Sequence, residues 1–298
     1  MLPFVYRRLG FMGSREAYRD ADLVLLGVPM DYTVSFQPGS RFGPQAIRSV
    51  SDALEEYSFY QHGSLAEVAF FDAGDVDLPF GNVEASLERI RAVARAVHGD
   101  GKIPIALGGE HLVTLPLVQA AKEFFPELAV FHFDAHADLR EEYLGEKLSH
   151  ATVMYQVANL VGPDHLYQFG IRSGTAEEYR YGQERTNFFP HAILDPLQQV
   201  IDRWDGRPVY VSIDIDVVDP AFAPGTGTPE PGGCSSEEML QALLLLMQLP
   251  VVAMDIVEVL PAQDVSQRTA LLAAKLVREA LIGFHLRKEK TFDRKGTV

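Results

Sequence analysis

LAVFHFD at Leu128–Asp134 and PVYVSID at Pro208–Asp214 are two nearly continuous apolar runs, each of strand length and each ending in an aspartate. A strand that is apolar on both faces is typical of a parallel sheet with helices packed on both sides. In such sheets ligands bind beyond the carboxyl ends of the strands. The two runs therefore favour an α/β fold, and they direct attention to the polar residues that follow each strand.

Similar runs rich in Val, Ile, Leu and Phe predict further strands at Asp22–Val28, Val68–Asp72, Ile103–Leu107, Leu166–Ile171 and Val251–Val257. Helical periodicity between the runs predicts helices that include Val83–Val97, Thr114–Phe125, Ser235–Gln248 and Ser266–Ile282. Alternating strands and helices imply right-handed crossovers. No linker or repeat divides the sequence, so we expect one domain over residues 1–298.

The balance of charged residues indicates which kinds of partner the chain is suited to bind. The 298 residues carry 26 Lys and Arg against 41 Asp and Glu, a formal net charge of −15. This acidity argues against a nucleic-acid partner, because affinity for nucleic acid comes mainly from cations that neutralise phosphates. It is compatible with a cationic substrate, and equally with solubility alone.

Membrane insertion and secretion are not expected either. The most apolar stretch, Met239–Met254, is interrupted by Gln241, Gln248 and Pro250 and is too short to span a membrane. The single cysteine, Cys234, cannot form an internal disulfide, and two arginines stand where the apolar core of a secretory signal would begin. We therefore expect a cytoplasmic location.

Three candidate metal ligands follow the first run, in Asp134-Ala135-His136-Ala137-Asp138. In extended backbone the period of two sends Asp134, His136 and Asp138 to one face. Each residue alone has an ordinary structural explanation, as a turn cap, a satisfied histidine or a solvated loop residue. Three together, directly after a strand, predict a metal site.

The second run leads into Asp214-Ile215-Asp216, whose two carboxylates also share a face. They would raise each other's pKa unless a cation lay between them. Asp219, which precedes a proline, is interpreted as a turn former or as a residue that orients a ligand, and not as a ligand itself.

A third polar cluster, Gly108-Gly109-Glu110-His111, follows the strand predicted at Ile103–Leu107. Its two glycines allow a sharp turn and a close approach of the backbone, and His111 opens the next helix. The cluster is not the G-x-G-x-x-G fingerprint, so no dinucleotide is implied.

The three clusters together offer two imidazoles and four carboxylates, which are too many ligands for one ion. They are His111, Asp134, His136, Asp138, Asp214 and Asp216. Two ions that share carboxylates fit better, and a set of nitrogen and oxygen ligands without cysteine suits manganese better than a structural zinc site. Because two-metal sites turn a bridging water into hydroxide near neutral pH, the predicted reaction class is metal-assisted hydrolysis.

Two further residues have both a functional and an ordinary interpretation. Glu258 ends the last predicted strand, where its carboxylate could bind a guanidinium or form a local salt bridge. His150, at a helix start after a polar loop, could move a proton to a leaving amine or simply be exposed.

Four ordered motifs resemble those of the ureohydrolases, the arginase/agmatinase family. They are GGEH at 108–111, FDAHAD at 133–138, SIDIDVVDP at 212–220 and DIVEV at 255–259, and the similarity extends from about Gly27 to the last helix. The resemblance implies a three-layer α/β/α fold around a mostly parallel eight-stranded sheet. It also implies a dinuclear manganese centre and a homo-oligomer, a trimer or hexamer.

The resemblance further implies roles for individual residues. The six candidate ligands would bind the two manganese ions, and Asp138 would also hydrogen-bond the hydroxide or the intermediate. Glu258 would bind the guanidinium of the substrate, and His150 would act as the acid or proton shuttle.

Arginases of this family carry an asparagine two residues after the last aspartate of D-A-H-x-D, where this chain has Arg140. This difference disfavours arginine as substrate. The loop Gly225–Gly233 and the Ser149-His150 context resemble the agmatinase form, although Ala151 replaces the glycine that many agmatinases have. The expected reaction is attack of the bridging hydroxide on agmatine, giving urea and putrescine for polyamine biosynthesis.

Alternatives remain open from the sequence. Guanidinobutyrate, guanidinopropionate, formimidoylglutamate and aminopropylagmatine are other substrates of the same chemistry. The ligand set alone also allows a dinuclear phosphoesterase, and the chain could be a regulatory homologue without activity.

Overall fold

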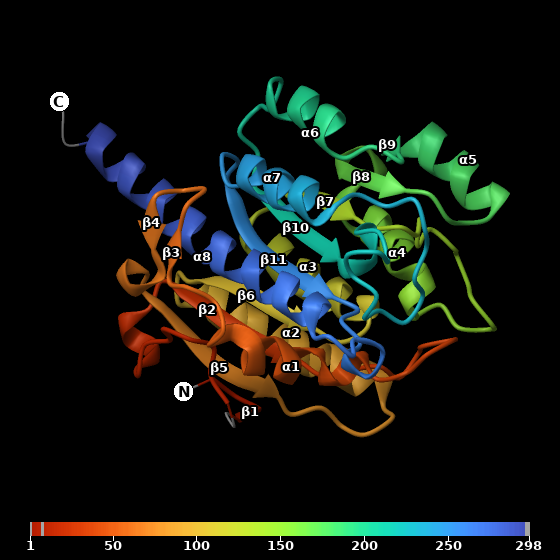
Figure 1. The fold of residues 1–298 in the computed structure, drawn as a ribbon. Helices are drawn as coiled ribbons and strands as arrows, with labels where there is room; N and C mark the ends of the chain where they lie inside the picture. The colour runs from red at the N-terminus through yellow and green to blue at the C-terminus, as the bar shows by residue number, and fades with distance from the viewer. Residues whose placement is uncertain (1, 7–8, 296–298) are drawn as a thin grey trace.

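The computed structural model describes residues 2–6 and 9–295, and over these a large mostly parallel sheet forms the centre of the molecule (Figure 1). Its parallel strands are β2 (Leu23–Val28), β5 (Phe70–Val76), β6 (Ile103–Gly108), β7 (Ala129–Phe133), β8 (Leu166–Ile171), β9 (Asn187–Pro190), β10 (Val209–Asp214) and β11 (Val251–Val257). A two-residue strand, β1 (Val5–Tyr6), pairs antiparallel with β5 at one edge. The order across the sheet is β1-β5-β2-β6-β11-β10-β7-β8-β9. The described sheet thus has nine strands, the expected eight being the parallel ones.

Helices cover both faces of the sheet and give the expected three layers (Figure 1). One layer contains α1 (Gly43–Ser51), α6 (Leu194–Ile201), α7 (Ser236–Leu246) and α8 (Arg268–Lys295), and the other contains α2 (Val83–Gly99), α3 (Thr114–Phe124) and α4 (Val153–Val161). The helix α5 (Ala176–Arg185) packs near β9, and a small hairpin of β3 (Tyr57–Ser58) and β4 (Gly63–Ser64) packs against α8.

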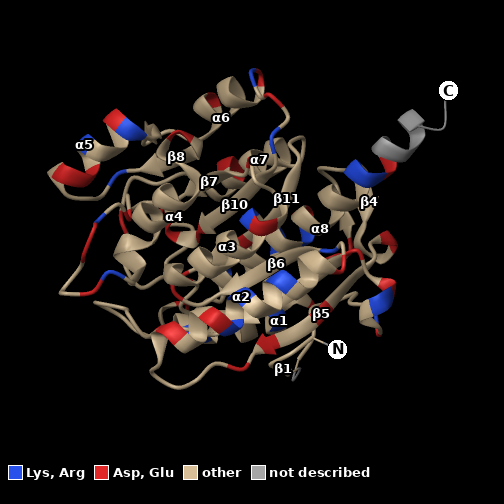
Figure 2. Cartoon of the chain, turned by 180° about the vertical axis from the view of Figure 1, so that it is seen from behind, with Lys and Arg blue, Asp and Glu red and all other residues tan. Residues whose placement is uncertain are grey.

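Burial on both faces explains why the strands read as continuous apolar runs. In β2, Leu23 and Leu25 belong to the core under α8, whereas Val24 and Leu26 belong to the core under α2 and α3. In Figure 2 the central strands are almost entirely free of charged residues, and both signs of charge lie mainly on outer helices and loops.

The predicted strands at Leu166–Ile171 and Val251–Val257 have the bounds of β8 and β11. The helix predicted at Ser266–Ile282 is longer, since α8 continues to Lys295. The strand β9 was not predicted, because its four residues, NFFP, are all only partly buried at the sheet edge and end in proline.

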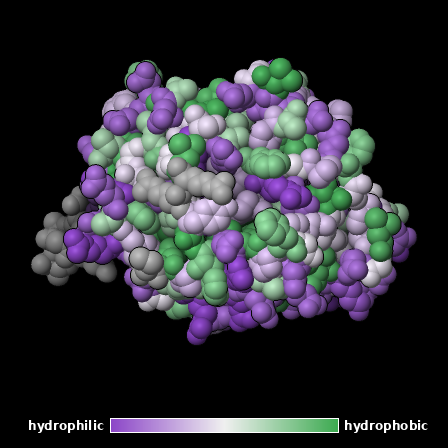
Figure 3. Space-filling model, turned by 90° about the horizontal axis from the view of Figure 1, so that it is seen from below, coloured by the Kyte–Doolittle hydropathy of each residue, from purple (hydrophilic) through white to green (hydrophobic). Residues whose placement is uncertain are grey.

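Figure 3 shows a mosaic of hydrophilic and hydrophobic residues on one face of the molecule. Among the described residues, no helix is long and apolar enough to cross a membrane.

Candidate metal centre

All six candidate ligands lie at or beyond the carboxyl ends of three strands, β6, β10 and β7. His111 follows β6, Asp134, His136 and Asp138 follow β7, and Asp214 and Asp216 lie at the end of β10. The strand β11, which lies between β6 and β10, ends just before Glu258. The parallel order therefore brings side chains that are distant in the sequence to one edge of the sheet.

The backbone around the cluster adopts unusual conformations that set the directions of the side chains. The strand β7 ends at Phe133, so the D-x-H-x-D segment is not the extended strand that the spacing predicted. Instead Asp138 has a φ of 53° and Glu258 a φ of 61°, both in the left-handed region that is uncommon outside glycine. Gly109 is needed for close approach, because a Cβ atom there would lie 1.9 Å from the carbonyl oxygen of Met30.

The first donor cluster is centred on Nδ1 of His111. This nitrogen lies 3.0 Å from Oδ2 of Asp134, 3.2 Å from Oδ2 of Asp138 and 3.3 Å from Oδ2 of Asp214. One N–H cannot donate to three carboxylates at once, and this buried nitrogen has no partner with hydrogen-bond geometry. Ligands at about 2.1 Å from one ion with octahedral angles lie about 3 Å apart, so the arrangement fits a shared cation.

The second donor cluster shares Asp134. Nδ1 of His136 lies 2.9 Å from Oδ2 of Asp216 and 3.5 Å from Oδ1 of Asp134. Oδ2 of Asp216 is buried and has no hydrogen-bond partner. The two oxygens of Asp134 therefore face different clusters, so this carboxylate could hold one ion in each cluster.

Backbone groups orient the carboxylates before any ion binds. Oδ1 of Asp214 accepts from the N–H of Asp216 at 2.9 Å, and Oδ1 of Asp216 accepts from the N–H of Ala135 at 3.0 Å. The other oxygen of each carboxylate is left to face an imidazole. The backbone hydrogen bonds therefore hold both carboxylates in the orientation that ion binding requires.

A buried polar network beneath the cluster fixes the tautomer of His111. The sheet register pairs Ser212 of β10 with Asp255 of β11. Ser212 donates to Asp255 at 2.7 Å, so its oxygen accepts from Nε2 of His111 at 3.0 Å. Asp255 also accepts from the hydroxyls of Thr114 and Tyr210, at 2.9 and 2.5 Å. Since Nε2 carries the hydrogen, the lone pair of Nδ1 faces the carboxylates.

His132 supports the cluster in a similar way, and sequence reasoning missed it. The amide of Gln168 donates to Nδ1 of His132 at 3.1 Å, so Nε2 of His132 donates to Oδ2 of Asp134 at 2.8 Å. His132 is close enough to the first cluster to be a ligand by distance alone. Because its Nε2 carries the hydrogen in this bond, we interpret His132 as a residue that positions Asp134.

The electrostatics of the cluster favour a cation. Burial, together with the charge of Asp134, raises the pKa of Asp138 to about 7. Burial and the charge of Asp216 raise the pKa of Asp214 well above its ordinary value. Buried carboxylates this close together require either protons or positive ions, and two divalent ions fit this donor set of imidazole and carboxylate without cysteine.

Glu258 lies beside the cluster and is 9% exposed. Its Oε1 accepts from the backbone N–H of His111 at 2.8 Å, and its own N–H donates to the carbonyl of Gly109. Burial and the nearby carboxylate of Glu110 raise the pKa of Glu258 to about 8. A cationic ligand beside Glu258 would stabilise its ionised form and lower this pKa again.

His150 lies at the start of a short 3-10 turn that leads into α4, as its sequence context predicted. The backbone N–H of His150 donates to the hydroxyl of Thr33 at 3.1 Å. Its ring nitrogen Nε2 lies 3.3 Å from Oγ of Ser35. Thr33 in turn donates to Glu110. Burial lowers the pKa of His150 to about 4, so the imidazole is neutral at pH 7.

One cavity of about 220 Å³ gives access to these residues. Its lining includes His111, His136, Asp138, His150, Asp214 and Glu258, and also Arg140, Tyr143, Glu178 and Thr228. Asp134 and Asp216 are fully buried behind them.

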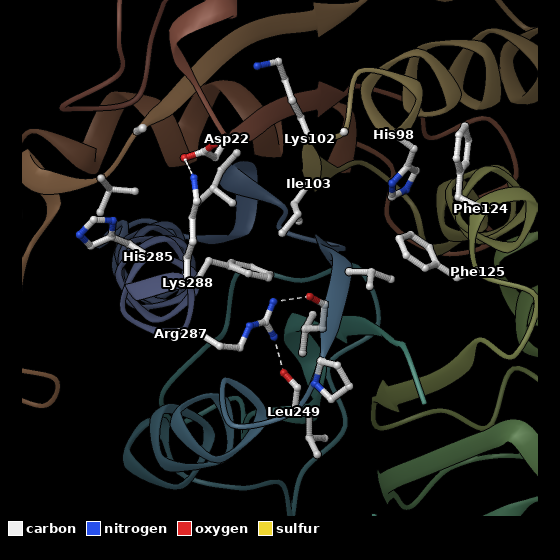
Figure 4. Close-up of a pocket in the computed structure, with 18 of the residues that line it drawn as sticks. Asp22, His98, Lys102, Ile103, Phe124, Phe125, Leu249, His285, Arg287 and Lys288 are labelled. Atoms are coloured by element: carbon white, nitrogen blue, oxygen red, sulfur yellow. Dashed lines mark hydrogen bonds and ion pairs between the residues drawn. The ribbon is translucent and has the colours of Figure 1, made fainter. Parts of the chain in front are cut away.

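A larger cavity of about 760 Å³ lies at the opposite edge of the sheet, by the amino ends of β2, β6 and β11 (Figure 4). None of the six candidate ligands lines it. Figure 4 shows Arg287 bonded to the carbonyl of Leu249 and Lys288 paired with Asp22. Size alone therefore does not identify the reactive site, which is marked by the converging donors.

The structure thus brings together every predicted site residue, including Glu258 and His150. Sequence reasoning missed His132, Ser212 and Asp255. A signal existed for the first two, since each lies on a strand two residues before a candidate ligand.

Comparisons with known proteins agree with this geometry. A sequence model of the arginase family matches residues 21–283. The agmatinase of Halalkalibacterium halodurans is 50% identical over 277 residues, which are 92% of this chain and 96% of that protein. The agmatinase of Bacillus subtilis is 49% identical over the same shares of the two chains. The structure of agmatine ureohydrolase from Thermoplasma volcanium is similar with a TM-score of 0.88 and 31% identity, covering 96% of this chain and 97% of that one. The chain belongs to the arginase family.

Proposed function

We propose that this protein hydrolyses agmatine to urea and putrescine with the help of two manganese ions. His111, Asp134, His136, Asp138, Asp214 and Asp216 would hold the ions. The proposal rests on two donor clusters that share Asp134 and lie in one cavity with the Glu258 carboxylate. The agmatinases at 49–50% identity support agmatine as substrate. When bound, the two ions supply a water nucleophile that is activated near neutral pH.

Glu258 would bind and orient the guanidinium. One of its oxygens is fixed by the N–H of His111, which leaves the other to accept from the substrate. A planar guanidinium offers paired N–H donors, and charge-assisted hydrogen bonds of this kind are about twice as strong as neutral ones. The substrate cation would also keep Glu258 ionised, although burial raises the pKa of that carboxyl to about 8.

His150 would carry a proton to the departing amine. Its lowered pKa makes the imidazole neutral at pH 7, so it must accept a proton before it donates one. The cavity gives it access to the reacting group, and Thr33 fixes its backbone. Asp138 would hydrogen-bond the nucleophile or the intermediate while it binds an ion.

The proposal includes a cellular setting. Putrescine is a polyamine, so we place the reaction in polyamine biosynthesis in the cytoplasm. We also propose a homo-oligomer, a trimer or hexamer. Phe59 and Phe80 are 83% and 96% exposed, and exposed aromatic side chains are common at subunit contacts. Light scattering in solution tests the assembly.

A urea-release assay tests the proposed reaction. The manganese-loaded protein is incubated with agmatine, arginine, 4-guanidinobutyrate and aminopropylagmatine, and both urea and amine are measured. We expect equimolar urea and putrescine from agmatine, and none from arginine. A protein that releases urea from none of these compounds contradicts the proposal, and hydrolysis of nitrophenyl phosphate would instead indicate a phosphoesterase.

A further inference from the structure

The wall of the metal-site cavity contains an ion pair that the proposed reaction does not use. Nε of Arg140 lies 3.3 Å from Oε2 of Glu178, and both residues line the cavity. The Arg140 side chain is 36% exposed, whereas that of Glu178 is 4% exposed. The cation therefore faces the cavity more openly than the anion behind it.

Glu178 is held in place by bonds other than the one to Arg140. It lies in the first turn of α5, where its Oε2 accepts from the backbone N–H of Thr175 at 2.8 Å in a capping box. Its Oε1 accepts from the backbone N–H of Leu139 at 3.1 Å. The negative charge of Glu178 is thus fixed by two backbone donors.

Arg140 is held on a second side by an aromatic ring. Its guanidinium carbon lies 4.6 Å from the ring centroid of Tyr143, a cation–π contact. The Tyr143 ring meets the His150 ring edge-on, with centroids 5.7 Å apart and an interplanar angle of 90°. Glu178 and Tyr143 therefore keep the guanidinium against the wall.

The charges along the cavity divide into two groups. Asp138, Asp214 and Glu258 face the ions and the guanidinium in the proposed reaction. The remaining formal charges in the lining are those of Arg140 and Glu178, which cancel. Without Glu178, a guanidinium would face the far end of the substrate, attracting a carboxylate and repelling an ammonium.

We propose that Glu178 determines specificity by cancelling the charge of Arg140, so that the cavity accepts guanidino compounds that end in an ammonium and not those that end in a carboxylate. This inference rests on the proposed function. Glu178 acts through Arg140 and does not contact the reacting atoms.

Agmatine and 4-guanidinobutyrate provide a matched test, since both have four carbon atoms in the chain and differ in the charge of the far end. Glu178→Gln keeps the size of the side chain and one carbonyl acceptor but removes the charge. We expect the ratio of kcat/KM for 4-guanidinobutyrate to that for agmatine to rise at least tenfold, mainly through the two KM values. A purely structural role would lower both kcat/KM values and leave their ratio unchanged.

Arg140 variants make the test independent of any folding defect in Glu178→Gln. Arg140→Met leaves the Glu178 carboxylate without its cation and should shift the ratio at least threefold toward agmatine. The double variant Arg140→Met/Glu178→Gln has neither charge and should return the ratio to within threefold of the wild-type value. Glu123→Gln, which removes a carboxylate paired with Arg91 on the outer surface, is the matched control and should not change the ratio.

The outcomes separate the two proposals. If the wild-type protein hydrolyses agmatine but neither Glu178→Gln nor Arg140→Met moves the ratio in the stated direction, this inference is wrong and the proposed function stands. A tenfold shift that persists in the double variant also overturns it. If the wild-type protein hydrolyses neither compound, the proposed function has failed and the inference falls with it.

Discussion

Ser212 shows how one hydroxyl can control a metal ligand that it orients from behind. It accepts from Nε2 of His111 and donates to Asp255, so the imidazole is held in the tautomer that presents the Nδ1 lone pair. Outer partners of this kind commonly contribute 10–100-fold to metal affinity. The effect of Ser212 should therefore appear in metal binding before it appears in stability.

Ser212→Ala should weaken manganese binding by roughly tenfold or more, because His111 loses its acceptor and can rotate or change tautomer. Titration of the chelator-treated protein with manganese, followed by calorimetry, measures the affinity. Ser86→Ala is a matched control, since Ser86 is also buried but its hydroxyl donates to the carbonyls of Pro79 and Asn82 near the start of α2 and not to a candidate ligand. Unchanged affinity in Ser212→Ala would mean that the backbone around His111 is enough to orient its imidazole.

Glu258→Gln should reduce kcat/KM for agmatine by about 100-fold or more, because a neutral amide replaces a charge-assisted acceptor for the guanidinium. The manganese content should remain two ions per chain, since Glu258 is not one of the six proposed ligands. Urea release and elemental analysis on the same sample separate the two effects. A variant that loses its metal, or that keeps full activity, would contradict the role given to Glu258.

The sequence predicted ligands better than it predicted the residues that support them. Asp134 and Asp214 stand out because a charged residue after an apolar strand is unusual. His132 and Ser212 precede them by two residues, so the strand period alone could have placed them in the same row. Glu178 has no comparable signal, because its approach to Arg140 depends on how α5 packs.

At the scale of elements, the loop over residues 220–233 is held by side chains from outside it. Nη2 of Arg172 donates to the carbonyl oxygens of Asp216 and Glu230 at 2.7 and 2.6 Å. Oδ1 of Asp219 accepts from the N–H of Ala221 at 2.9 Å, as in a turn, and Oδ2 accepts from the N–H groups of Gly232 and Gly233 across the loop. The loop carries Thr228 into the cavity.

Arg172→Lys should loosen this loop, because a single ammonium cannot reproduce the several carbonyl contacts of a planar guanidinium. We expect KM for agmatine to rise about three- to tenfold with a smaller change in kcat, and faster proteolytic cleavage within residues 220–233. Arg207→Lys is the control, since Arg207 pairs with Asp205 outside the cavity. Equal KM and equal cleavage rates in the two variants would show that the loop is held by Asp219 alone.

Gly109→Ala tests the close packing between the segments that follow β2 and β6. A Cβ atom would lie 1.9 Å from the Met30 carbonyl oxygen, so the backbone must move, at a cost of about 3 kcal/mol in the free energy of unfolding. Gly99→Ala is the control, because its nearest neighbour, an atom of Phe124, would lie at 3.9 Å. Urea unfolding of both variants measures the difference, and equal stability would contradict the packing argument.

Elements with two buried faces were predictable, and edge elements were not. β8 and β11 lie between neighbouring strands, so their apolar runs end where the strands end. β9 at the sheet edge is only partly buried, and its short sequence does not differ from a loop. The parallel order, which the alternation of elements implied, is what places the predicted ligands together.

At the scale of the whole molecule, the metal centre links folding to pH. In the metal-free protein, burial raises the pKa of Asp138 to about 7 and that of Glu258 to about 8, and it raises the pKa of Asp214 well above its ordinary value. Each raised carboxyl stabilises the fold below its unfolded pKa of about 4 and loses that contribution as the pH rises through the folded value. The stabilisation that bound ions provide increases with pH instead, because the carboxylates and imidazoles must be deprotonated to bind them.

The difference in Tm between the manganese-loaded and the chelator-treated protein should therefore be small at pH 5 and should increase to pH 8. Calorimetry at pH 5, 6, 7 and 8 measures it. The pKa of His98 is lowered to about 4 by burial, which favours unfolding at low pH, but this residue lies by the distant cavity and acts equally in both forms. Its effect cancels in the difference.

Asp138→Asn/Asp214→Asn provides the control for this prediction. It removes two of the raised carboxyls and two proposed ligands, so its Tm should not respond to manganese, and should fall less between pH 5 and 8 than that of the chelator-treated wild type. A wild-type difference that is constant across this range would mean that the cluster is neutralised without ions. Since the described ion pairs place no lysine or arginine on the carboxylates of the cluster, we expect the difference to grow.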